Sequence, residues 1–198
     1  MPVHCVTVYA ASSQALDATY TEAANRLGHL LAVSGLRIVY GGGSTGLMGA
    51  LADGALAAGG EVHGIIPEFL TRVERGHGGL TCLEVVADMR TRKARMLAEA
   101  DAVIALPGGC GTFEELFEAM TLKRLGQFLG PIILVNVNGY YDRLLQFMQY
   151  SVEQRFMNRT HLDMWQRVDQ PEAVPAALEG ATAWSRDSAL ACAVRRDS

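Results

Sequence analysis

The chain has 198 residues, a hydrophobic content of 49%, a charged content of 19% and a formal net charge of −4. This length supports one sizeable core and is short for two, and the composition excludes an intrinsically disordered chain. Because the charge is negative and no basic stripe is present, a nucleic-acid partner is not expected.

Short apolar, β-branched runs alternate with helical patterns along the chain. In chain order, strands buried on both faces are predicted at residues 5–9, 37–40, 61–66, 82–86, 102–106 and 132–137. Helices are predicted between them at residues 17–34, 45–58, 88–100, 112–125 and 140–154, and glycines 35, 59 and 126 end three of these. Residues 71–80 are glycine-rich and charged, so we expect a mobile connection or a lid there.

This alternation predicts the α/β fold class, with a parallel sheet flanked by helices in a single Rossmann-like domain. The domain is expected over residues 1–180, followed by a C-terminal tail over residues 181–198 that has little apolar periodicity. The high hydrophobic content also leads us to expect a homodimer that buries further apolar surface.

Three loops that follow predicted strands carry small or polar residues suited to an anion. In a parallel sheet the carboxyl ends of the strands share one edge, so these loops should converge. A helix N-terminus offers unpaired N–H groups, and glycines let a phosphate approach them. The alternative is that the glycines make tight turns and the serines a serine turn. The candidate phosphate or ribose contacts are Ser12, Ser13, Gly42, Gly43, Gly108, Gly109, Gly111 and Thr112.

The glycine loops favour a mononucleotide over a larger cofactor. The first loop, residues 41–46, lacks the Lys-Ser/Thr ending of an ATP-binding P-loop. Neither loop is followed about 20 residues later by a clear acidic ligand for the ribose of a dinucleotide. Cys110 has no histidine near it in sequence that would activate a nucleophile, so we interpret it as a filler residue.

Helical spacing in residues 88–100 places Met89, Arg92, Lys93 and Met96 on one face. Apolar and cationic side chains share that face, which favours an arginine that reaches inward. The alternative is a surface helix whose cations extend to solvent.

Glu115 lies three residues after Thr112, a spacing that is also typical of a capping box. A carboxylate one turn from a phosphate site costs Coulomb energy, and a purely structural cap there could have been glutamine. A catalytic role explains the charge better.

On these motifs the sequence resembles the Lonely-Guy family of cytokinin-activating nucleoside-monophosphate phosphoribohydrolases, which are often labelled lysine decarboxylases. The resemblance runs from the first strand to Phe156 and rests on these segments: residues 41–43 with 46–49, Met89 with Arg92 and Lys93, residues 107–115 and residues 136–141. It implies hydrolysis of the bond between an adenine-type base and ribose 5′-monophosphate, with Arg92 and Glu115 as the essential pair. It also implies a dimer without metal or cofactor. One departure is Arg90, where the family often has histidine.

Other functions stay open on the residues alone. A lysine decarboxylase would need a lysine that binds pyridoxal phosphate, and the only lysines, Lys93 and Lys123, lie in no recognisable cofactor site. A nucleosidase for other nucleoside monophosphates is an alternative, because nothing in the loops selects the base. A nucleotide sensor without hydrolysis, or a relative of Rossmann-like DNA-processing proteins, is another.

The compartment is expected to be the cytoplasm. The four cysteines lie far apart without a Cys-x-x-Cys pair, and no charged segment precedes an apolar stretch at the N-terminus. The longest uncharged run, residues 125–141, contains glycine, proline and asparagine, so no membrane-spanning segment is expected.

Overall fold

The computed structural model describes residues 2–72 and 76–193. Seven parallel strands form one sheet in the order β4-β3-β2-β1-β5-β6-β7. The strands are β1 (Cys5–Tyr9), β2 (Arg37–Tyr40), β3 (Val62–Pro67), β4 (Cys82–Val86), β5 (Ala102–Ala105), β6 (Ile132–Val135) and β7 (Gln166–Val168). The predicted α/β class with a parallel sheet is confirmed.

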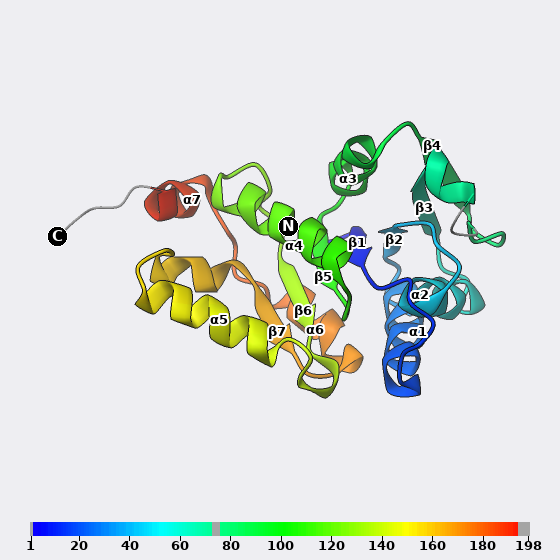
Figure 1. Cartoon of the computed structure of the whole chain (residues 1–198), viewed down its shortest axis with the longest axis horizontal. Coiled ribbons are helices and arrows are strands. Elements are labelled where there is room, and N and C mark those ends of the chain that lie inside the picture. Colours follow the sequence, from blue (N-terminus) through cyan, green and yellow to red (C-terminus); the bar gives the residue numbers. More distant parts are fainter. Residues whose placement is uncertain (1, 73–75, 194–198) are drawn as a thin grey trace.

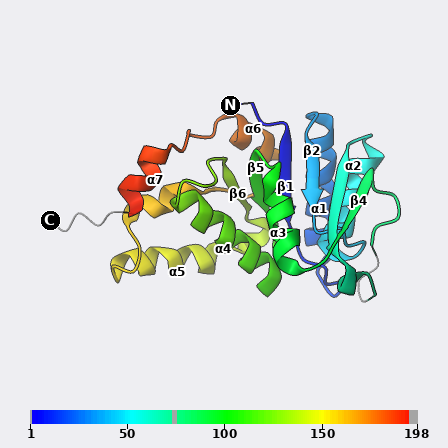
Figure 2. The same ribbon diagram turned by 90° about the horizontal axis from the view of Figure 1, so that it is seen from above.

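Helices cover both faces of the sheet (Figure 1). They are α1 (Ala18–Val33), α2 (Gly46–Ala57), α3 (Met89–Ala98), α4 (Cys110–Arg124), α5 (Asp142–Glu153), α6 (Val174–Glu179) and α7 (Arg186–Ala193), with short 3-10 turns η1 (Glu68–Arg72), η2 (Val137–Gly139), η3 (Arg159–Met164) and η4 (Pro171–Ala173). One core packs α1, α2 and α6 against the sheet, and a second packs α3, α4 and α5 against the opposite face. The view in Figure 2 shows α1 and α2 grouped beside β2, with α3 and α4 across the sheet from them.

Side-chain caps begin two of the helices, and glycines end three of them near the predicted positions. Asp17 and Asp88 cap the N-termini of α1 and α3, because their carboxylates accept hydrogen bonds from the amides of Thr19 and Thr91. Glycines 35, 59 and 126 follow the ends of α1, α2 and α4 with φ of 72°, 76° and 70°. This left-handed conformation favours glycine, as the pattern predicted.

The order of the strands fixes where a ligand can bind. From β1 the chain continues outward through β2 and β3 to β4, then returns to the other side of β1 to form β5. The loops after β1 and β5 therefore diverge to opposite faces, and they leave a crevice between the carboxyl ends of these two strands.

Three sequence expectations about the fold are wrong in detail. β4 lies at the sheet edge and is not buried on both faces, because Leu83 and Val85 are 39% and 55% exposed. β7 was not predicted, since three residues of mixed polarity carry little strand signal. The fourth long helix begins at Cys110, two residues before the expected Thr112.

The expected tail and lid lie partly within the described residues. Within residues 181–193, α7 forms and packs Ala189, 3% exposed, close to Gly126 at the end of α4; residues 194–198 lie outside the described part. In the expected lid, residues 73–75 also lie outside it. Beside them Gly76 pairs with Gly43 in an isolated bridge, and His77 Nε2 lies 2.9 Å from an Asp53 carboxylate oxygen. Of the helices described, none is both long and apolar enough to cross a bilayer.

Candidate functional site

A cavity of about 280 Å³ opens at the carboxyl edge of the sheet, in the crevice between β1 and β5. The loop after β1 contributes residues 10–13, α2 contributes one side chain, α3 another, and the start of α4 the remainder. The structure therefore brings together seven residues that the sequence singled out: Ser12, Ser13, Arg92, Gly109, Gly111, Thr112 and Glu115.

The N-terminus of α4 presents unpaired amides to this cavity. Gly109 is the N-cap, and the first helical hydrogen bond runs from the amide of Phe113 to the carbonyl of Gly109. The three amides of residues 110–112 precede that bond and point out of the helix end. A Cβ on Gly109 or Gly111 would meet no atom within 4 Å, so both glycines border open space. This arrangement suits a phosphate.

The helix start also rules out the capping-box interpretation of Glu115. Thr112 is the third residue of α4 and not its N-cap, so Glu115 cannot reach back to a cap amide there. The hydroxyl of Thr112 instead lies over Gly108, where a Cβ would fall 2.1 Å from Thr112 Oγ1. Glu115 is free of a capping role.

Arg92 lies buried across the cavity from α4, with 7% of its surface exposed. Its Nε donates to the carbonyl of Ile65 and its Nη2 to the carbonyl of Gly41, both at 3.1 Å. A Cβ on Gly41 would lie 2.0 Å from Nη2, so only glycine leaves room for the guanidinium. These contacts hold the planar group with its Nη1 edge toward the cavity.

The carboxylate of Glu115 faces that edge, with Oε1 3.7 Å from Arg92 Nη1. Burial raises the pKa of Glu115 to about 7, because the charged form loses hydration, while the positive charge of Arg92 opposes this rise. Glu114 raises the pKa further. A carboxyl that titrates near neutral pH can exchange protons during a reaction at that pH.

The first glycine loop does not contact the cavity as the sequence analysis expected. Gly42 and Gly43 are buried and do not line the cavity. A Cβ on Gly42 would approach the side chain of Leu83 at 3.1 Å, and the carbonyl of Gly43 accepts a hydrogen bond from the hydroxyl of Tyr40. The structure places both glycines in the packing beneath the site.

The rest of that loop supports the loop after β1. Thr45 Oγ1 donates to the carbonyl of Ser12, and the amide of Met48 donates to the carbonyl of Ala11. A Cβ on Gly46 would lie 2.4 Å from the carbonyl oxygen of Ser13. The amide of Met48 at the start of α2 is thus occupied by the loop after β1, which ties that loop to α2.

Three further predicted residues, Gly108 beneath Thr112, Met89 and Lys93, lie beside the cavity without lining it. Lys93 Nζ pairs with Glu114 at 2.7 Å and with Glu118 at 3.0 Å, which joins α3 to α4. Met89 Sδ lies 3.8 Å from Arg92 Nη1. Arg90, which stands where the resemblance often has histidine, is exposed.

Sequence reasoning missed two residues at this site. The side chain of Met48 lines the cavity, and its only signal was its place in a glycine-rich helix start. The hydroxyl of Tyr140 donates to the carbonyl of Gly108 and fixes the second glycine loop from a segment 32 residues away. The resemblance included residues 136–141, but it gave Tyr140 no role in the site.

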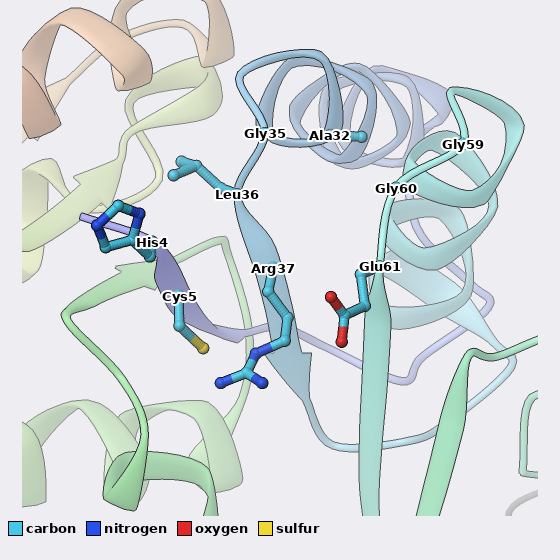
Figure 3. A pocket seen from close by; sticks show the side chains of 9 residues that line it. All are labelled: His4, Cys5, Ala32, Gly35, Leu36, Arg37, Gly59, Gly60 and Glu61. Carbon is cyan, nitrogen blue, oxygen red and sulfur yellow. The ribbon is translucent and has the colours of Figure 1, made fainter. Parts of the chain in front are cut away.

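A larger cavity of about 410 Å³ lies at the opposite, amino edge of the sheet (Figure 3). Its polar lining includes His4, Arg37 and Glu61. Arg37 is already paired with Glu99 at 2.7 Å, and α1 and α2 end at this cavity and do not begin there. Helix C-termini present carbonyls, so this cavity lacks the amides of the first one.

Comparisons with known proteins identify the family of this chain. A family model described as possible lysine decarboxylase matches residues 48–178. The cytokinin riboside 5′-monophosphate phosphoribohydrolase of Rhodococcoides fascians is 46% identical over 153 residues, which cover 77% of each chain. The phosphoribohydrolase LOG2 of Arabidopsis thaliana is 43% identical over 155 residues, 78% of this chain and 73% of that protein.

Solved structures share the fold. The X-ray structure of TM1055 matches with a TM-score of 0.71 at 24% identity and covers 89% of this chain and 98% of that one. The molybdenum cofactor carrier protein of Chlamydomonas reinhardtii matches with a TM-score of 0.69 at 19% identity, over 90% and 97% of the two chains. On the family model and the relatives above 40% identity, the chain belongs to the Lonely-Guy family of lysine decarboxylase-like proteins.

Proposed function

We propose that this chain hydrolyses the N-glycosidic bond of cytokinin riboside 5′-monophosphates, and of AMP, to give the free base and ribose 5-phosphate. The observation that carries the proposal is the buried pair of Arg92 and Glu115 beside the open N-terminus of α4. The names of the relatives from Rhodococcoides fascians and Arabidopsis thaliana support the same reaction.

The phosphate of the substrate would bind at the start of α4. The amides of residues 110–112, the hydroxyl of Thr112 and the two serines after β1 supply donors around the cavity. Binding energy from this group, remote from the bond that breaks, holds the sugar in place for the reaction.

Glu115 would act on the sugar as a carboxylate. Glycosidic cleavage passes through an oxocarbenium-like state, which a carboxylate stabilises or supplies with an activated water. Because burial raises the pKa of Glu115 to about 7, its ionised form is a stronger base than an ordinary glutamate and is still well populated at neutral pH.

Arg92 would orient the substrate and stabilise charge without moving a proton. A guanidinium stays protonated at working pH. Two backbone carbonyls fix its plane, and the edge that faces Glu115 remains directed at the cavity. This places a permanent positive charge beside the carboxylate that the reaction needs.

We also propose a homodimer in the cytoplasm. Large apolar side chains are exposed on and after α4 and α5: Phe117, Leu125, Phe147, Tyr150 and Phe156. A self-association surface would cover them. Three cysteines, Cys5, Cys82 and Cys110, are free thiols, which suits a reducing compartment. The mass of the protein in solution tests the dimer, and subcellular fractionation tests the compartment.

Purified protein incubated with AMP, isopentenyladenosine monophosphate and a pyrimidine monophosphate tests the reaction. We expect free adenine-type base and ribose 5-phosphate from the first two. Release of every base at the same rate would favour a general nucleosidase. Saturable binding of AMP with no adenine on prolonged incubation would favour a nucleotide sensor and contradict the proposal.

A further inference from the structure

A separate cavity of about 440 Å³ lies at the amino edge of β6 and β7, away from the catalytic pair. It is enclosed by the end of α4, the start of β6, η3 and residues 181–188. Figure 1 shows α7, which begins within this last segment, beside the end of α4. The segment lies beyond residues 48–178, where the family model matches, so this cavity is partly built by residues outside the shared region. Its larger apolar lining residues are Pro131, Ile132, Leu162, Met164, Trp165 and Trp184.

A buried lysine provides the positive charge in this cavity, and Asp163, an exposed carboxylate that is not among the groups shifting the pKa of that lysine, also lies on the wall. Lys123, in the last turn of α4, is 3% exposed and lines the cavity wall. Its Nζ donates to the carbonyl of Gly130 and lies 5.5 Å from the centre of the Trp184 ring. The indole N–H of Trp184 in turn donates to the carbonyl of Lys123 at 3.0 Å. The contacts fix the ammonium group between a carbonyl and an aromatic face.

These contacts leave the charge of Lys123 incompletely balanced. Burial alone lowers its pKa, to about 8, and among the described residues no carboxylate counteracts that effect. The amine is therefore still mostly protonated at neutral pH. An ammonium group has three donors, and a buried cation without a counterion is costly. An anionic ligand would supply the missing partner.

We propose that this cavity binds a small aromatic carboxylate. The carboxylate would accept hydrogen bonds from Lys123 Nζ, and the ring would pack against Trp165 and Trp184. The volume falls within the range of small-molecule sites, which are mostly apolar with a few placed polar groups. Offset or edge-to-face packing of the ligand ring on the indoles favours an aromatic acid over an aliphatic one.

The site is distinct from the catalytic cavity. Lys123 and Glu115 lie on the same helix, and eight residues of α4 separate them by about 12 Å along the axis. The two cavities share no lining residue. The hydrolysis of nucleotides can thus report folding of variants at Lys123 without depending on the proposed ligand.

Tryptophan fluorescence tests the proposal directly, because both tryptophans of the chain line this cavity. The wild-type protein is titrated with benzoate and with benzamide, a neutral molecule of nearly the same shape. We expect a saturable change with benzoate and binding of benzamide that is at least about tenfold weaker. Equal binding of the two, or no saturable change with benzoate, would overturn the proposal without any variant.

Two variants test whether the positive charge of Lys123 binds the carboxylate. Lys123→Met should weaken benzoate binding at least about tenfold, because it removes the ammonium group and keeps a long side chain. Arg143→Met, which removes an exposed cation on α5, is the matched control and should bind benzoate as the wild type does. Unchanged benzoate affinity in a Lys123→Met protein with normal thermal unfolding would contradict the site.

Discussion

Replacing Glu115 by glutamine should stabilise the folded protein above neutral pH. Burial raises the pKa of this carboxyl from 4.5 to about 7, so the folded state holds its proton more tightly than the unfolded chain does. Below pH 4.5 both states are protonated, and the folded wild type suffers no penalty. As pH rises to about 7 the stability is progressively lost, and above that the loss stays near 3 kcal/mol. Glutamine carries no charge and avoids this loss.

Thermal unfolding followed by circular dichroism measures the effect. For a chain of this size about 3 kcal/mol corresponds to a Tm higher by roughly 6–12 °C. We expect most of this gain at about pH 8 and little of it at about pH 5. Glu22→Gln, which changes an exposed glutamate on α1, is the control and should show no pH-dependent gain. A Glu115→Gln protein whose Tm difference from the wild type is the same at both pH values would refute the raised pKa.

Three further predictions concern the catalytic cavity. Glu114→Gln should lower the pKa of Glu115, because the Glu114 charge raises it; the limb of kcat/KM that rises with pH should then move to lower pH, and an unmoved limb would contradict the assignment. Arg92→Lys should lower kcat by about 100-fold or more in a base-release assay, since an ammonium group cannot replace the fixed planar fork, and near-normal turnover would contradict that role. Gly111→Ala should raise KM about tenfold with Tm unchanged, because its Cβ would meet no atom within 4 Å and would enter the phosphate region. Gly108→Ala should instead lower Tm, because its Cβ would lie 2.1 Å from a threonine hydroxyl; the same response in both variants would contradict the assignment of the two glycines.

The parallel sheet was predictable because its strands follow buried, β-branched runs and its helices end at glycines. The exposed face of β4 was not predictable, because the sequence does not show which strand lies at the edge of the sheet. β7 is three residues long, and it is a strand only because β6 lies beside it. α7 packs on α4 through Ala189, a contact that no periodicity within the segment reveals.

The candidate site was predictable only in part. The glycines at the start of α4 and the carboxylate one turn later lie at the cavity, as the motif implied. Gly42 and Gly43 do not, because a glycine needed for close packing looks the same in sequence as one needed for a ligand. The Thr-x-x-Glu spacing was ambiguous until the helix start at Cys110 decided it. The cavity around Lys123 was not predicted, since it joins segments that lie far apart in the chain.

Assay of Glu115→Gln with isopentenyladenosine monophosphate tests whether Glu115 is the catalytic carboxylate. Binding of the nucleotide and release of free base are measured on the same preparation, with the wild type beside it. We expect the variant to bind the nucleotide as the wild type does, because the α4 amides are intact, and to release almost no base. Base release at a rate near that of the wild type would contradict the assignment of Glu115 as the catalytic carboxylate.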